Sequence, residues 1–175
     1  MERLSVSLDE KSISIIKKFL EKYETSHADV IRRALNCLDS MEGIKEKAPV
    51  KDILIYIDFL ANKEHLIVDI AHWKLIFTQI GEGTDIFWEE VYDIGDAHRK
   101  EYFDKGLREV KQILKYLEKT NWFKLSIDSD KSFTLILAVL ESSKFIKTFL
   151  EGLFSKHPQK VKISQEYMKI RINIC

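Results

Sequence analysis

The sequence predicts an α+β protein, with a small strand–helix–helix unit at the N-terminus and an α+β domain with an antiparallel sheet after it. Apolar residues alternate at residues 3–8 and then follow helical spacing to residue 41. Residues 42–51 interrupt this pattern with Gly43, Pro49 and several charges. Alternation returns after residue 122. We therefore expect domains at residues 1–43 and 52–175, joined by a linker at residues 44–51.

The first predicted element is a strand at residues 3–8 that is buried on one face. Its apolar face holds Leu4, Val6 and Leu8, and its polar face holds Arg3, Ser5 and Ser7. Such a short alternation, taken alone, more often marks the solvent face of an edge strand.

Two helices are predicted to follow this strand. Asp9 is placed to cap the first helix, whose apolar residues run at helical spacing over residues 13–23. Ser26 is placed to cap the second, whose apolar stripe covers residues 30–41. Gly43 marks the expected end of the second helix, because glycine adopts left-handed backbone easily.

A unit of this size has groups that it cannot satisfy alone. A lone short strand leaves its backbone N–H and C=O groups unpaired, and two short helices bury too little apolar surface. In a second copy, the two strands would pair antiparallel and four helices would share one core. The size of the unit therefore predicts a homodimer.

The alternating segment RLSVSL at residues 3–8, the capped helix after it and the segment TSHADVIRRAL at residues 25–35 form one ordered pattern. This pattern resembles the ribbon-helix-helix DNA-binding family, the class of Arc and MetJ, over residues 3–41. One residue departs from the family. Glu24 stands where the family often has glycine, at a turn where left-handed backbone suits glutamate less well.

The resemblance implies a two-stranded ribbon, one strand from each subunit, in the major groove of double-stranded DNA. The implied base contacts are Arg3, Ser5 and Ser7. Arg3 suits guanine O6 and N7 through its fork of donors. The implied phosphate contacts, at the start of the second helix, are Thr25, Ser26 and His27. The implied dimer core consists of Leu4, Val6, Leu8, Ile16, Phe19, Ile31, Leu35 and Leu38.

The charge of the chain is unusual for a DNA reader. The 28 Lys+Arg balance the 28 Asp+Glu, whereas DNA-binding domains usually carry a basic excess. Residues 1–43 contain seven Lys+Arg and eight Asp+Glu. We therefore expect weak non-specific binding with a shallow salt dependence, and specificity that rests on the strand and on helix N-termini.

The composition predicts a folded chain that does not enter a membrane. Hydrophobic residues make up 45% and charged residues 32% of its 175 residues, too apolar for disorder and too charged for a bilayer. The N-terminus lacks an apolar signal segment, which favours a cytoplasmic location. Cys37 and Cys175 cannot form a disulfide framework or a four-thiolate zinc site.

The second domain is predicted to begin with helices and to end in strands. Its expected elements are helices at 50–60 and 73–80, a short strand at 66–70, a long helix at 96–120, a hairpin of 123–128 with 133–140, a helix capped by Ser142 or Ser143, and a closing hairpin of 161–164 with 168–174. The continuous apolar run at 133–140 suits a strand buried on both faces. The long helix carries an apolar stripe that we interpret as core, rather than as a dimer seam. This stripe consists of Phe103, Leu107, Val110, Leu114 and Leu117.

The order of helix, hairpin, aromatic helix and hairpin, with Phe149-Leu150-Glu151-Gly152-Leu153 in the aromatic helix, faintly resembles 4-vinyl-reductase-like small-molecule-binding domains. The cysteines common in that family are absent from the corresponding end, so the resemblance implies no metal. Asp93, Asp96, His98 and Glu101 include residue types that bind divalent metals, but positions 96, 98 and 101 do not share one helical face. We interpret them as a solvated helix start rather than a metal site.

The sequence carries no phosphate loop, nucleophile elbow or zinc-protease motif, so we expect neither an enzyme nor a bound cofactor. An apolar effector pocket is one interpretation of the aromatic residues of the second domain, and ordinary core is the other. These residues are Trp73, Phe77, Phe87, Trp88, Tyr92, Tyr102, Phe103, Trp122, Phe123, Phe133, Phe145, Phe149 and Phe154.

Taken together, the sequence predicts a sequence-specific transcriptional regulator whose second domain, at residues 52–175, either binds an effector ligand that controls it or extends dimerisation. Its expected partners are double-stranded DNA, further copies of the chain in a homodimer or tetramer, and a small apolar effector, with no membrane partner. Two alternatives stay open. One is the antitoxin of a toxin–antitoxin pair, and the other is a small-molecule or cofactor-binding protein that uses the N-terminal unit only to dimerise.

Overall fold

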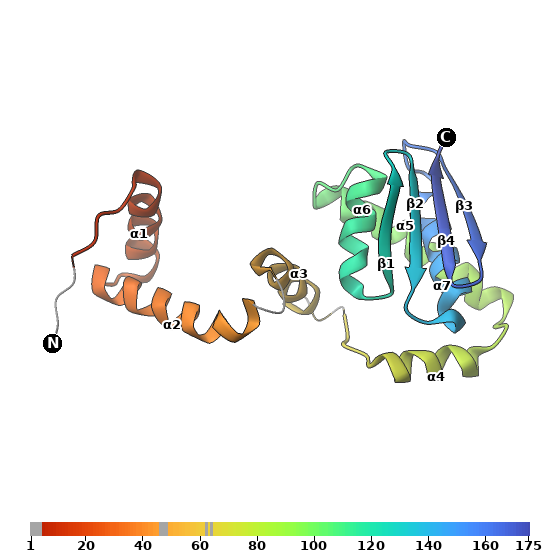
Figure 1. The fold of residues 1–175 in the computed structure, drawn as a ribbon, viewed down its shortest axis with the longest axis horizontal. Helices are drawn as coiled ribbons and strands as arrows, with labels where there is room; N and C mark the ends of the chain where they lie inside the picture. Colours follow the sequence, from red (N-terminus) through yellow and green to blue (C-terminus); the bar gives the residue numbers. More distant parts are fainter. Residues whose placement is uncertain (1–4, 46–48, 62, 64) are drawn as a thin grey trace. The chain divides into compact units, whose positions relative to one another are not determined.

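The structure is a computed structural model that describes residues 5–45, 49–61, 63 and 65–175. The chain divides into two compact units, Met1–Leu54 and Ile55–Cys175. Helix α3 (Val50–Ala61) crosses this division (Figure 1). Of the predicted linker, residues 46–48 lie outside the described residues, and its last two residues belong to α3.

The first unit contains helices α1 (Glu10–Tyr23) and α2 (His27–Lys45), with both predicted caps in place. The Asp9 carboxylate accepts a hydrogen bond from the Ser12 amide at 2.7 Å. The Ser26 hydroxyl accepts one from the Asp29 amide at 3.2 Å. The predicted helix end at Gly43 is wrong, because α2 continues through Gly43 to Lys45.

The turn between α1 and α2 has left-handed backbone, which a glycine would adopt more easily. Glu24 adopts left-handed backbone, with φ 47° and ψ 48°, and its amide donates to the Leu20 carbonyl. A non-glycine residue in this region carries a steric cost from its Cβ. The left-handed turn therefore forms at a residue that does not favour this backbone.

The predicted dimer core of the first unit lies largely open to solvent in the single chain. Val6 is 75% exposed and Leu35 58% exposed, and α1 buries none of its residues. Val30 is the one buried apolar side chain among the described residues of this unit. Ser5–Leu8 lie outside any helix or strand, and Arg3 and Leu4 lie outside the described residues. The predicted ribbon needs a strand from each of two copies, so it stays a prediction.

The second unit is an α+β fold with a four-stranded antiparallel sheet, as predicted. Its elements after α3 are α4 (Ile70–Ile80), α5 (Asp85–Asp104), α6 (Val110–Leu117), the 3-10 turn η1 (Glu118–Thr120), β1 (Phe123–Ser129), β2 (Ser132–Leu137), the 3-10 turn η2 (Leu140–Ser142), α7 (Ser143–Phe154), β3 (Val161–Glu166) and β4 (Lys169–Ile174). The strand order is β1-β2-β4-β3, so two hairpins join side by side. Both predicted hairpins and the aromatic helix are confirmed.

Two predicted elements of this unit are wrong. Residues 66–70 form no strand, and α4 begins at Ile70 behind the Asp69 cap. The long helix predicted at residues 96–120 is two helices, because Gly106 adopts left-handed backbone (φ 81°) between α5 and α6. A capping box of Glu109 with Gln112 starts α6.

The core of the second unit lies between α5, α6, α7 and one face of the sheet. Val110, Leu114 and Leu117 are fully buried there, which confirms their interpretation as core. The expectation that the strand after residue 132 is buried on both faces is wrong. Phe133 and Leu135 are fully buried, but Ile136, on the other face, is exposed. The helices therefore cover one face of the sheet.

Helices α5 and α7 cross at two glycines. In Figure 1 they lie together on one side of the sheet. A Cβ atom on Gly95 would overlap the carbonyl oxygen of Phe149, and one on Gly152 would overlap that of Tyr92. Each glycine thus lets the backbone of the other helix approach closely. Ser142 stands at the N-cap position of α7 as predicted, but its hydroxyl donates to the Val139 carbonyl instead of capping the helix.

Within the described ranges, no helix combines the length and the apolar character that a membrane span requires.

Candidate functional site

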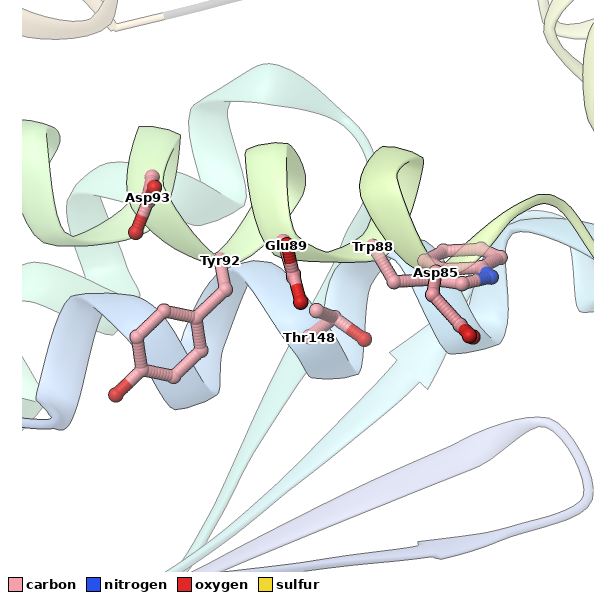
Figure 2. A pocket seen from close by; sticks show the side chains of 6 residues that line it. All are labelled: Asp85, Trp88, Glu89, Tyr92, Asp93 and Thr148. Carbon is pink, nitrogen blue, oxygen red and sulfur yellow. The ribbon is translucent and has the colours of Figure 1, made fainter.

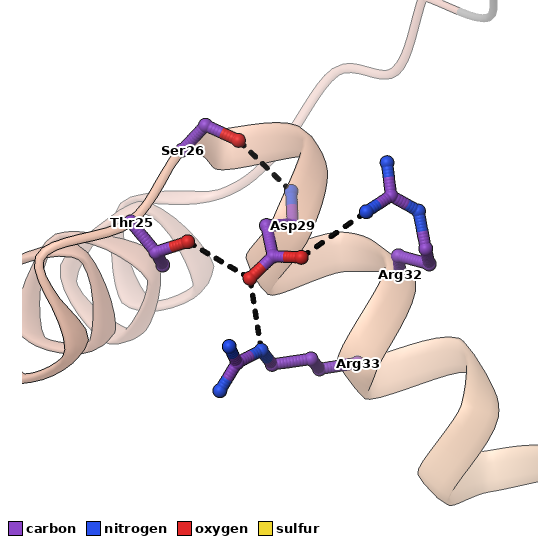
Figure 3. Close-up of polar contacts among 5 residues, drawn as sticks. All are labelled: Thr25, Ser26, Asp29, Arg32 and Arg33. Atoms are coloured by element: carbon purple, nitrogen blue, oxygen red, sulfur yellow. Dashed lines mark hydrogen bonds and ion pairs between the residues drawn. The ribbon is translucent and has the colours of Figure 1, made fainter.

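The start of α2 is organised around the carboxylate of Asp29 (Figure 3). The Thr25 hydroxyl donates to it at 2.8 Å, while the Asp29 amide donates to the Ser26 hydroxyl. Arg32 and Arg33, one turn further along α2, donate to the two carboxylate oxygens at 3.1 Å and 2.9 Å. Two of the three predicted phosphate contacts therefore already take part in a local polar network.

The hydrogen bond from Thr25, together with the charges of Arg33 and Arg32, lowers the pKa of Asp29, so this carboxylate stays ionised at neutral pH. A negative charge in the first turn of a helix is favourable for the helix. It also opposes a phosphate at the same end. His27, the first residue of α2, is exposed. Among the described residues, the hydrogen bonds to the Asp29 carboxylate come from Thr25, Arg32 and Arg33 and do not involve His27.

The two arginines are functional candidates that the sequence analysis did not single out. Both guanidinium groups are largely exposed while paired with Asp29, so their outer N–H groups can reach a further anion. Their spacing from Asp29, three and four residues, is the signal that could have found them, because residues at this spacing share a helical face. Ser5 and Ser7 are exposed as predicted, whereas Arg3 lies outside the described residues.

The second unit contains a cavity of about 930 Å³ beside the end of the sheet. Its walls come from the end of α3, the segment at residues 65–69, the start of α4, the turn before β1 and the end of β2. Trp73 and Trp122 both line it, and their rings stack at 5.8 Å with an interplanar angle of 16°. Three of the aromatic residues that the sequence offered for an apolar pocket line this cavity: Trp73, Trp122 and Phe123.

Some of the aromatic residues predicted either as pocket or as core line the cavity, and others lie in the core. Trp73, Trp122 and Phe123 line the cavity. Phe133, Phe149 and Phe154 are buried in the core. Tyr56 and Phe59 also line the cavity. The sequence analysis did not name them, because α3 showed only helical periodicity and nothing that placed it against the later strands.

Helix α3 is tied to α5 and α6 by a polar cluster. The Asp58 carboxylate accepts hydrogen bonds from Lys105 Nζ at 2.7 Å and from the Tyr116 hydroxyl at 3.1 Å. Lys105 also pairs with Glu101 at 3.0 Å. The hydrogen bond from Lys105 lowers the pKa of Asp58, while burial raises that of Tyr116. At neutral pH Asp58 is therefore ionised and Tyr116 is protonated, and their contacts hold one wall of the cavity in place.

A smaller, acidic pocket of about 570 Å³ lies along α5 and α7 (Figure 2). Asp85, Glu89 and Asp93 follow one another at four-residue spacing on its α5 side. Lys144 Nζ lies 4.3 Å from the centre of the Trp88 ring, so one face of this indole already carries a cation. The pocket therefore combines three acidic side chains with aromatic walls from Trp88 and Tyr92.

Asp93, Asp96, His98 and Glu101, which the sequence suggested as a solvated helix start, do not lie at the start of their helix. Because α5 begins at Asp85, the residues 93–101 stand in its middle and last turns, so that interpretation is wrong. Asp96 pairs with Arg99 at 3.0 Å and Lys156 at 2.8 Å. Among the residues that the structure describes, no group of three or more His, Cys, Asp or Glu is arranged to hold a metal ion.

No family model, no curated protein and no solved structure matches the chain. The function is therefore proposed from the residues themselves.

Proposed function

We propose that the protein is a homodimeric, sequence-specific DNA-binding transcriptional regulator, and a binding protein rather than an enzyme. The proposal rests on the order of the elements in the first unit. This unit holds two helices with caps at Asp9 and Ser26, a left-handed turn at Glu24, and an alternating segment before them. These features occur at the spacing of the ribbon-helix-helix pattern.

The exposed apolar stripe of the unit supports the dimer. Ile31, Leu35 and Leu38 lie on α2 at spacings of four and three, and all three are exposed in the single chain. Water around such a stripe is unfavourable, and a second copy would remove it from solvent. Pairing of the two N-terminal segments in the same dimer would satisfy their backbone groups as well.

The DNA contacts follow from the same arrangement. Arg3, Ser5 and Ser7 would read base edges from the ribbon, because the major groove presents a distinct pattern of donors and acceptors for each base pair. Phosphates would be held at the start of α2 by Ser26, His27 and the outer N–H groups of the nearby arginines. Such phosphate contacts set the register of the protein on DNA.

Replacing Arg3, Ser5 and Ser7 together by alanine is expected to remove sequence-specific binding while the dimer stays folded. Each good base contact contributes about 1–3 kcal/mol of discrimination. The measurement has two steps. Selection of genomic DNA fragments by the wild-type protein first gives a short repeated site, and titration of that site then compares the variant with the wild type. A random collection of fragments, or an unchanged specific affinity in the folded variant, would contradict the proposal.

Replacing Asp29 by asparagine is expected to strengthen non-specific DNA binding and to steepen its salt dependence. The amide can still accept from Thr25, but it no longer neutralises Arg32 and Arg33. If both arginines then reach phosphates, the slope of log affinity against log salt becomes steeper by about 1–2 units. Asp39→Asn is the matched control, because it removes the same charge from an exposed position further along α2. Equal slopes for the two variants would show that the arginines do not approach DNA.

The cavity favours a ligand-controlled regulator over an antitoxin, and it also keeps one alternative open. A small-molecule-binding protein that uses its first unit only to dimerise would carry the same cavity. The fragment selection separates the two, because such a protein would enrich no common DNA sequence. Co-purification with a small toxic partner protein would instead favour the antitoxin.

A further inference from the structure

We propose that two copies of the chain join through strand β3, so that their two four-stranded sheets form one continuous antiparallel sheet. The contact is argued from the second unit alone. It rests on the proposed function in one respect, because the homodimer of the first units brings the two β3 strands close together.

The two edges of the sheet differ in how they are protected. Strands β1 and β3 are its outer strands (Figure 1), and an outer strand presents backbone groups to which another strand can add. On β1, the Glu118 carboxylate accepts a hydrogen bond from the Leu125 amide at 2.8 Å. The pairing of β1 with β2 is also irregular between Ile127 and Ser129. Strand β3 pairs with β4 in one unbroken register, so β3 presents the more regular edge.

Alternate residues of β3 direct their backbone groups away from the sheet. In an antiparallel pair, successive residues bond alternately toward the neighbouring strand and away from it. The Cys175 amide donates to the Lys160 carbonyl at 2.9 Å, so the even-numbered residues of β3 bond to β4. The odd-numbered residues face outward, and within the described ranges no loop or side chain bonds to their backbone groups. These residues are Val161, Ile163 and Gln165.

The outward-facing residues can pair with those of a second copy in an antiparallel arrangement. If the twofold axis passes through Ser164, Ile163 of each copy lies opposite Gln165 of the other, and each such pair exchanges two hydrogen bonds. Val161 and Ile163 already pack against the core with part of their surface, and the second copy would cover part of the rest. Neighbouring registers satisfy the backbone as well, so the side chains decide between them.

The charges of β3 favour the register centred on Ser164. In this register Lys162 of each copy lies opposite Glu166 of the other, and both side chains are exposed. Opposite charges at directly facing positions stabilise a pair of strands. An axis at Ile163 would place Lys162 opposite Ser164 and leave Glu166 opposite Lys160, which precedes the strand. The register centred on Ser164 is therefore the one in which β3 complements itself within its own length.

The contact is expected to be weak by itself. One pair of short strands buries far less surface than the roughly 1,200–2,000 Å² of a stable protein interface. In the homodimer the second β3 is tethered nearby, at an effective concentration of about 1 mM for a short linker. We therefore expect the second units to pair in the dimer and to separate when the first units dissociate.

The test introduces a cysteine on the proposed axis of the full chain. Ser164→Cys is made together with Cys37→Ser and Cys175→Ser, which remove the two exposed native thiols. A residue on the axis faces its own copy with Cα atoms about 4.5 Å apart, within the range of a disulfide. We expect a disulfide-linked dimer in a glutathione redox buffer, measured by non-reducing electrophoresis.

Lys162→Cys in the same background is the matched control. It lies on the same strand and the same face and is exposed, but in the proposed register its two copies are four positions apart, about 13 Å along the strand. It should form at least about tenfold less disulfide, because this separation exceeds the reach of the bond. Equal yields at the two positions would mean random collision, and a higher yield at Lys162→Cys would mean another register. Either result overturns the inference.

A charge variant tests the register independently. In the Ser164→Cys chain, Lys162→Glu places two carboxylates opposite each other at both ends of the contact, and we expect the yield of disulfide to fall about fivefold. Adding Glu166→Lys restores opposite charges and should recover most of the yield, with circular dichroism as the check on folding, because Glu166 also pairs with Arg171. Lys124→Glu, the same change at an exposed position of β1, should leave the yield unchanged. Equal yields for Lys162→Glu and Lys124→Glu would contradict the proposed contact.

The outcomes separate this contact from DNA recognition. If Ser164→Cys links selectively but the fragment selection enriches no sequence, the contact is supported and the proposed function fails. If the selection succeeds but Ser164→Cys does not link, the proposed function stands and the inference is overturned. Another segment that filled the edge of β3 would also prevent the link at Ser164, and would overturn the inference in the same way.

Discussion

Replacing Gly152 by alanine should destabilise the second unit by about 3 kcal/mol or more, at the upper end of the range for overpacked cores. In an exposed helix this change would be favourable, because alanine has the higher helix propensity. Here the new Cβ atom would overlap the carbonyl oxygen of Tyr92 on α5. The obstacle is backbone, so no side-chain rotation relieves it, and α5 and α7 must separate. Gly95→Ala should behave in the same way against Phe149.

Thermal unfolding, followed by circular dichroism, measures this effect as a loss of roughly 10 °C in the midpoint temperature. Glu90→Ala is the control, since it introduces alanine at an exposed position of the same α5 helix. Its midpoint should change little. A Gly152→Ala variant as stable as Glu90→Ala would mean that the two helices do not approach as closely as described.

Replacing Leu35 by glutamate should convert the proposed dimer into a monomer and remove the proposed DNA binding with it. Leu35 is 58% exposed in the single chain, so the isolated subunit tolerates the charge. In the proposed dimer the same position is buried, and a carboxylate there would lose its hydration without a partner. We expect dimer association to weaken at least about 100-fold, which corresponds to roughly 3 kcal/mol.

Sedimentation equilibrium over a range of protein concentrations reports this change directly, and far-ultraviolet circular dichroism checks that the helices persist. Asn36→Glu is the matched control, because it adds the same charge at the neighbouring exposed position of α2, outside the apolar stripe. A Leu35→Glu protein that remains dimeric would place the subunit contact on another surface.

Local signals predicted much of the fold. Asp9 and Ser26 cap their helices as expected, since a cap depends on only three or four consecutive residues. The two hairpins were predictable because short polar turns separate strand-like segments. An alternating segment and a continuous apolar run flank the first turn, and alternating segments flank the second. The first, residues 123–137, is confirmed at both of its strands.

The predictions of secondary structure were wrong where a local apolar pattern continues past the end of a helix, or where segments distant in the sequence come together. The apolar stripe over residues 103–117 keeps helical spacing across Gly106, so periodicity alone joined α5 to α6. Residues 66–70 have the composition of a strand but line a cavity beside the sheet. Of the candidate site, the turn at Thr25 and Ser26 was predictable. The ion pairs of Arg32 and Arg33 and the cavity wall from α3 depend on side-chain geometry that spacing does not determine.

The strand order of the sheet has a consequence for how the chain acquires its structure during synthesis. The two central strands are β2 and β4, and α7 and β3 lie between them in the chain. Ile170 and Ile172 of β4 are fully buried, so the core of the second unit closes only after the ribosome has made every other element of that unit. The first unit emerges long before. If the proposed dimer forms through the N-terminal units, two nascent chains are able to associate while their second units are still unfinished.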